Sequence, residues 1–389
     1  MKHSIAAARM RDIQPFHVMA LLAEARQREA AGQDIIHMEV GEPDFPTPAP
    51  IVEAGIRALQ AGQTKYTAAR GLPPLREAIA DYYASRFGVN ISPDRILITP
   101  GASGALQLVL GALINPGDEV LMTDPGYPCN RHFVRLFEGI ATALPVGADT
   151  AYQLTPVHIQ QHWSTKTRAV MLATPANPTG TVLSMAQLTA LHAEVQARGG
   201  QLIVDEIYQG LTYGVPDVTA LAVDADNTWV INSFSKYFGM TGWRLGWVVA
   251  PEWAVESLDR LAQNIFLAAS TPAQYAALAA FTPESLGMME MQRQELQRRR
   301  DFLLPALRDL GFVIGVEPQG AFYVYANSSH FCDDAQRLSR AMLDQTGVVF
   351  TPGLDFGSHQ AATHVRFAYT TEVARLEQAV ARLARHLPR

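Results

Sequence analysis

A chain of 389 residues exceeds what one hydrophobic core usually supports, so we expect two domains. Its composition, 48% hydrophobic and 17% charged, is typical of a globular protein with a large core. The net charge of −6 and the lack of a basic run argue against nucleic-acid binding. No apolar run reaches the roughly 18 residues that a membrane-spanning helix needs.

The N-terminal sequence MKHSIAAARMRD lacks the apolar segment of a secretory signal, so we expect a cytoplasmic protein. The two cysteines, Cys129 and Cys332, agree with a reducing compartment. They form no CxxC pattern, and the histidines show no ligand-like spacing. The sequence therefore predicts no metal site.

The first 250 residues change from one helical pattern to a regular alternation of strands and helices. The helical pattern covers 17–33 and ends near Gly32, and the Pro-rich segment GEPDFPTPAP follows it. Short β-branched or apolar runs then lie at 95–99, 119–122, 168–173, 201–204, 228–232 and 246–250. A helix over about 185–198 has Ser184 as its N-cap and Gln187 three residues later. Such alternation predicts a mostly parallel sheet covered by helices on both faces.

The last hundred residues show a mixed pattern. An Arg-rich helical stretch covers about 284–310, and a second helix is expected near 333–345 before a terminal one. Strand-like runs lie at 312–316, 320–326, 347–353 and 364–369. We therefore expect a large α/β domain at 46–285 and a smaller α+β domain formed by 1–45 and 286–389.

Five of the expected strands are followed by residues able to bind a ligand. In α/β sheets, ligands bind beyond the carboxyl ends of the strands. The turn PGASGAL after 95–99 opens a helix, whose first amides and dipole favour an anion. The other four strands precede Tyr127, Asn177, Asp205 with Tyr208, and Lys236. Pyridoxal phosphate (PLP) has groups to match this set: a phosphate, a flat ring, a ring nitrogen, a phenolic oxygen and an aldehyde.

The chain resembles the class I/II aminotransferases, which are PLP enzymes of fold-type I, over nearly its whole length. The resemblance is carried, in order and spacing, by GEPDFPTP, KYTAARGLPPLREAIA, TPGASGAL, PANPTG, DEIY, SFSKYFGMTGWRLGW and HVRFAY. It implies a fold-type I transferase with a large PLP-binding domain, in which a mostly parallel sheet lies between helices, and a smaller α+β domain.

Lys236 is the expected point of cofactor attachment. A Schiff base needs a primary amine, and arginine does not lose its proton near neutral pH. The chain has only four lysines, so a lysine inside SFSKYFGM is unlike a chance surface charge. The resemblance also gives Lys236 the proton transfer during the reaction, Asp205 the task of keeping the ring nitrogen protonated, and Tyr208 and Asn177 the phenolic oxygen. A helix cap for Asp205, a turn for Asn177 and a core role for Tyr208 are the structural alternatives.

The resemblance assigns the other cofactor contacts as well. Tyr127 would stack on the ring, and Tyr66 would contact the phosphate of the neighbouring subunit. The expected phosphate ligands within the chain are Ala102, Ser103, Ser233 and Arg244, and Ser235 is a weaker candidate. An ordinary turn at PGASG and a surface charge at Arg244 are the alternatives.

The substrate side depends on Arg366, which interrupts the apolar run at 364–369. The resemblance implies that its fork binds the α-carboxylate, which a lysine could not reproduce. An internal ion pair is the alternative. Gly41 and Asn177 would lie beside the same carboxylate. Two arginines, Arg70 and Arg131, are candidates for a distal carboxylate. Phe16, His17 and Tyr323 would line a pocket for a neutral or apolar side chain.

Together these residues predict a PLP-dependent aminotransferase that moves an amino group from an amino acid to a 2-oxo acid, as a homodimer with shared active sites. A carbon–sulfur β-lyase or another fold-type I elimination enzyme uses the same cofactor contacts and stays the alternative. A PLP-binding sensor without catalytic activity is less well supported, because the catalytic set is complete.

Overall fold

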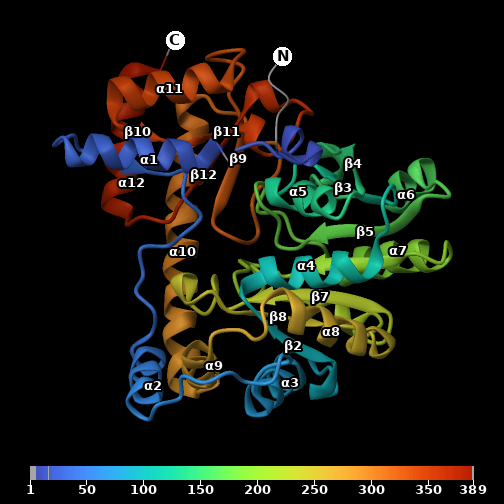
Figure 1. The fold of residues 1–389 in the computed structure, drawn as a ribbon. Coiled ribbons are helices and arrows are strands. Elements are labelled where there is room, and N and C mark those ends of the chain that lie inside the picture. Colours follow the sequence, from blue (N-terminus) through green and yellow to red (C-terminus); the bar gives the residue numbers. More distant parts are fainter. Residues whose placement is uncertain (1–5, 16, 388–389) are drawn as a thin grey trace.

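The computed structural model describes residues 6–15 and 17–387 (Figure 1). Its α-helices are α1 (His17–Ala30), α2 (Ala49–Gln60), α3 (Pro73–Phe87), α4 (Gly101–Leu113), α5 (Pro128–Leu136), α6 (Pro156–His162), α7 (Met185–Gln196), α8 (Val255–Ile265), α9 (Thr271–Leu278), α10 (Pro283–Leu310), α11 (Ala335–Thr346) and α12 (Val373–His386). Its strands are β1 (Ile36–His37), β2 (Ile96–Thr99), β3 (Glu119–Asp124), β4 (Ile140–Pro145), β5 (Thr167–Ala173), β6 (Gln201–Asp205), β7 (Thr228–Ser233), β8 (Gly246–Val249), β9 (Tyr323–Asn327), β10 (Val348–Val349), β11 (Thr351–Pro352) and β12 (His364–Ala368).

The central sheet has seven strands in the order β2-β8-β7-β6-β5-β3-β4. Strand β8 is antiparallel to both of its neighbours, and the other pairs are parallel. Strands β2, β3, β5, β6 and β7 therefore run in the same direction, and their carboxyl ends meet at one edge. The prediction of a mostly parallel sheet within an α/β fold is confirmed.

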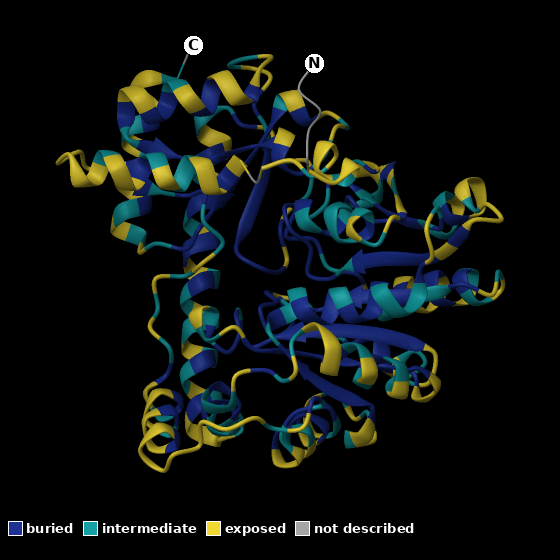
Figure 2. Cartoon of the chain, viewed as in Figure 1, coloured by how far each residue is buried: buried dark blue, intermediate teal, exposed yellow. Residues whose placement is uncertain are grey.

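Both faces of this sheet are buried (Figure 2). Along β5, Val170 and Leu172 belong to one apolar core, whereas Ala169 and Met171 belong to the core on the other face. This alternation follows from the two-residue period of a strand. It explains why the predicted strands are apolar at nearly every position.

Local signals account for several helix ends. The amide of Gln187 donates to the Ser184 hydroxyl (3.3 Å), and the Ser184 amide donates to the Gln187 side chain (2.9 Å). This reciprocal cap begins α7 at the position that the sequence predicts. Helix α1 begins differently, because the amides of His17 and Val18 donate to the carboxylate of Asp355, 338 and 337 residues away in the chain.

The C-terminal part contains the antiparallel sheet β11-β12-β9 and the parallel pair β1-β10. The expected strand at 312–316 is wrong, because this segment forms only an isolated bridge between Val313 and Asn327. Phe312 is buried in the core, but Val313 is 62% exposed and the segment pairs with no strand beyond that bridge. Strand β4 is not among the predicted strands. Its first residue, Ile140, is exposed, so the segment lacks the buried pattern of the other strands.

The long helix α10 connects the two parts, passing from α2 to α12 (Figure 1). A single apolar core contains both Leu172 of the central sheet and Phe367 of β12. The small sheet is therefore packed against the large one across continuous apolar surface. Among the described residues, none of the helices combines the length and the apolar character that crossing a bilayer requires.

Candidate active site

The amine of Lys236 lies at the carboxyl edge of the central sheet, in the turn that follows β7. Its Nζ donates a hydrogen bond to the main-chain carbonyl of Gly41 at 2.7 Å. The ring centroids of Tyr208 and Phe322 both lie 5.9 Å from Nζ. Aromatic walls on two sides and a fixed main-chain acceptor hold the amine in a partly buried position.

The surroundings of Lys236 lower its pKa to about 8. Burial is the main cause, and the positive charges of Arg244 and Arg366 act in the same direction, whereas the charges of Glu42 and Asp205 oppose it. At pH 7.5 the neutral fraction of the amine is roughly 200 times that of a lysine with an ordinary pKa. Lys236 is thus prepared to act as a nucleophile near neutral pH.

Asp205 ends β6 and is only 4% exposed. Its Oδ1 accepts a hydrogen bond from the Ile207 amide at 3.2 Å, and the described residues place no cation in an ion pair with it. Burial raises the pKa of this carboxyl to about 7, although the amide bond and the charge of Lys236 act against that rise. A buried carboxylate without a paired cation fits the protonated ring nitrogen of PLP, which would supply the missing charge.

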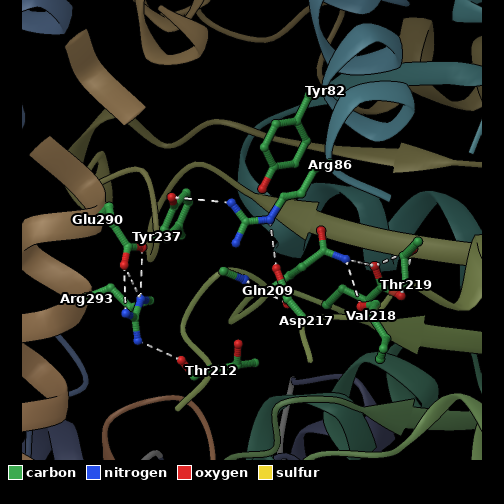
Figure 3. Close-up of polar contacts among 12 residues, drawn as sticks. Tyr82, Arg86, Gln209, Thr212, Asp217, Val218, Thr219, Tyr237, Glu290 and Arg293 are labelled. Carbon is green, nitrogen blue, oxygen red and sulfur yellow. Dashed lines mark hydrogen bonds and ion pairs between the residues drawn. The ribbon is translucent and has the colours of Figure 1, made fainter. Parts of the chain in front are cut away.

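A buried polar network fixes the loop behind Asp205 (Figure 3). The amide of Gln209 donates to the Glu206 carboxylate at 2.7 Å, and Thr219 donates to the same carboxylate at 2.9 Å. The other end of Gln209 accepts from Asn232 at 3.0 Å, and Asn232 in turn accepts from the Ser233 amide at 2.7 Å. The residues around Asp205 and Ser233 are therefore connected by a continuous chain of hydrogen bonds.

A second group in Figure 3 fixes the residue after Lys236. The guanidinium of Arg86, from α3, lies 5.2 Å from the ring centroid of Tyr237. Its Nε donates to Asp217 at 2.8 Å, and the Gly210 amide donates to the same carboxylate at 3.2 Å. These contacts tie α3 and the loop after β6 to the turn that carries Lys236.

An anion cradle lies next to this turn. Helix α4 begins at Gly101, so its first amides, including those of Ala102 and Ser103, face outward from its N-terminus. A Cβ built on Gly101 would lie 2.8 Å from Nη2 of Arg244, so the guanidinium covers the first turn of the helix. The hydroxyl of Ser233 lies 3.0 Å from that of Ser235 on the same side. Helix amides, a guanidinium and hydroxyls are the groups that bind phosphate.

Arg366 is 2% exposed in β12, with polar partners on three segments. Its Nη1 donates to the Asn177 side chain at 2.8 Å. Its Nη2 donates to the main-chain carbonyl of Glu39 and to the hydroxyl of Thr351. Nε has no partner among the described residues, and none of their carboxylates forms an ion pair with the guanidinium. The expected alternative of an internal ion pair is therefore not what the structure contains.

Aromatic rings enclose Arg366 and connect it to the other residues. The ring centroids of Tyr323 and Phe356 lie 4.3 and 4.7 Å from its central carbon. The hydroxyl of Tyr323 lies 2.9 Å from that of Tyr208, and a Cβ on Gly41 would lie 2.1 Å from the Tyr323 hydroxyl oxygen. Burial raises the pKa of Tyr208 well above its usual range, so its hydroxyl keeps its proton and remains a donor.

The structure places Tyr127 and Asn177 on the wall of one pocket, together with Arg131 and Phe356. Tyr127 immediately precedes α5. Nη2 of Arg131 donates to the main-chain carbonyl of Asp355 at 3.2 Å. Arg131 thus lies in the wall of this pocket, close to the ring that covers Arg366.

Among the described residues, Arg70, Tyr66 and His17 form no hydrogen bond with Lys236, whose amine donates to Gly41. Arg70 donates to the main chain of Asp94, whose carboxylate lies 3.9 Å away. Tyr66 is 82% exposed in the loop between α2 and α3. The side chain of His17 is exposed at the start of α1, and Phe16 lies outside the described residues.

Several residues that shape this site were not among the predicted ones. Phe322 faces Lys236, Phe356 covers Arg366, and Glu39 and Thr351 accept hydrogen bonds from it. None of them lies in one of the motifs that carry the family resemblance. These segments are far apart in the chain and come together only on folding, so the sequence does not reveal their common location.

Comparison with known proteins agrees with this geometry. The sequence model of the family "Aminotransferase class I and II" matches residues 33–383. The chain is 36% identical to a (5-formylfuran-3-yl)methyl phosphate transaminase of Methanocaldococcus jannaschii, over 97% of this chain and 98% of the relative. It is also 36% identical to a valine–pyruvate aminotransferase of Mycobacterium tuberculosis, over 97% of each.

The crystal structure of an aminotransferase from Mycobacterium tuberculosis superposes with a TM-score of 0.95 at 35% identity, over 99% of both chains. Class I aminotransferases use PLP and act on amino acids and 2-oxo acids. Asp205, Lys236 and the cradle at α4 offer partners for the ring nitrogen, aldehyde and phosphate of that cofactor. The chain belongs to the class I and II aminotransferases, PLP-dependent enzymes of fold-type I.

Proposed function

We propose that Lys236, Asp205 and Arg366 form the catalytic and substrate-binding centre of this aminotransferase. One observation carries the proposal: the amine of Lys236 lies near both a buried carboxylate without a paired cation and a buried guanidinium without a carboxylate. The amine suits an aldehyde, Asp205 suits a protonated ring nitrogen, and Arg366 suits the substrate carboxylate.

Bound PLP supplies an electron sink for the bonds at the α-carbon. Asp205 keeps the proton on the ring nitrogen, because a buried carboxylate is most stable beside a positive charge. Tyr208 and Asn177 donate hydrogen bonds toward the phenolic oxygen. Lys236 attaches the cofactor and, once released, carries the proton at the substrate α-carbon, for which its lowered pKa suits it.

The remaining contacts position these groups. We assign the phosphate to the amides of α4, with Ala102 and Ser103, and to Ser233 and Arg244 beside them. The ring of Tyr127 stacks on the cofactor. Arg366 grips the α-carboxylate with its fork, and the main chain of Gly41 lies beside the same group.

We propose amino acids with a neutral side chain as the substrates. Arg70 is occupied by Asp94, and the rings of Tyr323 and Phe356 form apolar walls beside Arg366. The valine–pyruvate activity in the name of one relative agrees with this class. Arg131 is the residue that would favour an acidic side chain, since the described residues place no carboxylate in an ion pair with it.

A half-reaction tests the reaction type and the substrate together. With valine and no acceptor, the absorbance of the bound cofactor should change once, with one amino group taken up per site, and a 2-oxo acid should reverse the change. Aspartate should react at least about tenfold more slowly, because its distal carboxylate is buried without a partner as long as Arg131 keeps its bond to the Asp355 carbonyl. Stopped-flow absorbance and amino acid analysis measure both. Continuous release of ammonia without the reversible change would contradict amino transfer.

We also propose a homodimer in which Tyr66 contacts the cofactor phosphate of the neighbouring subunit. Its exposure, and the distance in sequence between its loop and the strand ends, support a role outside its own chain. Arg244 is likewise exposed at the edge of the cradle. A partner subunit would cover both residues.

Mixing two disabled variants tests the shared site. If Tyr66 acts on the neighbouring subunit, each Lys236→Ala/Tyr66→Ala mixed dimer has one site with both defects and one intact site. An equal mixture should then recover about a quarter of wild-type activity, because half of its dimers are mixed. Activity and native mass spectrometry, which verifies subunit exchange, measure the outcome. Unchanged low activity after verified exchange would contradict the shared site.

Two further assignments complete the proposal. We place the domain boundary near residue 285, at the start of α10, with 46–285 as the PLP-binding domain and 1–45 with 286–389 as the small domain. We also place the protein in the cytoplasm, a location with which the free thiols of Cys129 and Cys332 agree.

A further inference from the structure

His37, in β1, lies between two carboxylates. Its Nδ1 lies 2.7 Å from Oε1 of Glu39, and its Nε2 lies 3.2 Å from Oε1 of Glu29 on α1. A neutral imidazole has one N–H and can donate to only one of them. Both contacts are satisfied together only when both ring nitrogens carry a proton, so the geometry favours the imidazolium.

Glu39 connects this histidine to the substrate side of the active site. Its side chain is fully buried, and its Oε2 has no partner among the described residues. Its main-chain carbonyl accepts hydrogen bonds from Arg366 and from Thr351. Glu39 thus holds Arg366 through its main-chain carbonyl and also has a buried carboxyl group at the end of its own side chain.

Other charges near β1 are paired elsewhere. On α12, Arg375 and Arg382 form ion pairs with Asp34. On α1, Arg28 pairs with Glu24 and with a carboxylate of α11. Strand β10, which pairs with β1, contributes only Val348 and Val349. Among the described residues, His37 is therefore the cation in direct contact with the Glu39 carboxylate. Arg366 is also bonded to Glu39, but through the main-chain carbonyl.

We propose that His37 is a positioning residue for substrate binding, which as an imidazolium neutralises Glu39 beside Arg366 and so preserves the affinity for the α-carboxylate. The inference rests on the proposed role of Arg366. Loss of the His37 proton would leave a net negative charge in a buried place, where it acts strongly on a nearby anion. By reciprocity, binding of the carboxylate would tighten the hold of His37 on its proton.

The direction of the pH dependence follows from the same contacts. The bond to Glu39 raises the pKa of His37 above its ordinary value, although burial acts in the opposite direction. The proton is thus present at and below the ordinary pKa of about 6.5 and is lost as the pH rises through the raised value. Carboxylate affinity should fall over that upper range.

The experiment measures the Kd of 2-aminoisobutyrate on the holoenzyme by calorimetry from about pH 6 to pH 9, a range that covers histidine titration. This amino acid has the α-amino and α-carboxylate groups of every donor but no transferable α-hydrogen. Wild-type Kd should rise as His37 loses its proton. His37→Gln should bind about tenfold more weakly than wild type at the acidic end, because a neutral amide replaces the positive charge beside the Glu39 carboxyl group.

The matched variants should change the Kd of 2-aminoisobutyrate in different ways. Glu39→Gln should bind as tightly as the acidic wild type and lose the rise, and the double variant His37→Gln/Glu39→Gln should resemble Glu39→Gln. His192→Gln is the control, a buried histidine near Asp224 whose change should leave the Kd as in wild type. Ratios of variant to wild-type Kd remove the pH dependence that Lys236 contributes.

Two results would overturn the inference. In one, His37→Gln keeps wild-type affinity and its pH profile. In the other, all three variants bind equally weakly and have lower melting temperatures, which indicates a structural role alone. Arg366→Lys separates this failure from that of the proposed function: if it binds 2-aminoisobutyrate as wild type does, the role of Arg366 itself is wrong.

Discussion

Lys236→Ala should lower kcat for amino transfer by at least about 10⁴-fold, because the variant loses both the nucleophile and the proton carrier. The pKa of about 8 makes the wild-type amine reactive near neutral pH, whereas the side chains of Lys65 and Lys166 are exposed. Steady-state kinetics on purified protein measures the loss.

Cofactor attachment supplies a second measurement. Borohydride reduction of the wild-type holoenzyme, followed by peptide mapping, should place the adduct on Lys236. Lys166→Ala is a matched control, since this exposed lysine lies far from the carboxyl edge of the sheet and its loss should leave kcat unchanged. An adduct on Lys65 or Lys166, or an active Lys236→Ala enzyme, would refute the assignment.

Arg366→Lys should reduce kcat/KM by about 10²- to 10³-fold while the protein keeps its PLP. The three hydrogen bonds and two ring contacts of the guanidinium depend on its planar fork, which an ammonium group cannot reproduce. The reduction corresponds to about 3–4 kcal/mol of lost transition-state stabilisation.

Arg70→Lys is the control, because Arg70 interacts with Asp94 rather than with the residues around Lys236. Its kcat/KM should stay close to the wild-type value. Absorbance of bound cofactor verifies that Arg366→Lys keeps PLP. A normal kcat/KM in that variant would mean that the arginine serves only the packing of β12.

The sequence predicted the strands of the central sheet because strands buried on both faces are continuous apolar runs. Strand β4 lies at the edge, with Ile140 44% exposed, and so lacks that pattern. The run at 312–316 has the apolar residues of a strand but no partner strand beyond one bridge. Pairing between distant segments decides such cases, and single-sequence patterns do not contain it.

The candidate site was predictable where it depends on strand direction. Parallel strands bring Asp205 and Lys236 to one edge whatever the loops between them do. The contacts of Arg366 were not predictable, because Glu39 and Asn177 lie 327 and 189 residues away in the chain. The bond to Asn177 results from the docking of the C-terminal sheet onto the central one, and the bond to Glu39 results from the packing of the segment after β1 against β12. No local pattern specifies either contact.

The contact between Gly41 and Tyr323 has a consequence for altering substrate range by directed evolution. A methyl group at position 41 would collide with the Tyr323 hydroxyl, which is held in place by its hydrogen bond with Tyr208. Its carbonyl also accepts from Lys236, so backbone shifts there would move the reactive amine. Libraries intended to alter the substrate range are better directed to Arg131 and Phe356, whose side chains line the pocket that also contains Tyr127 and Asn177.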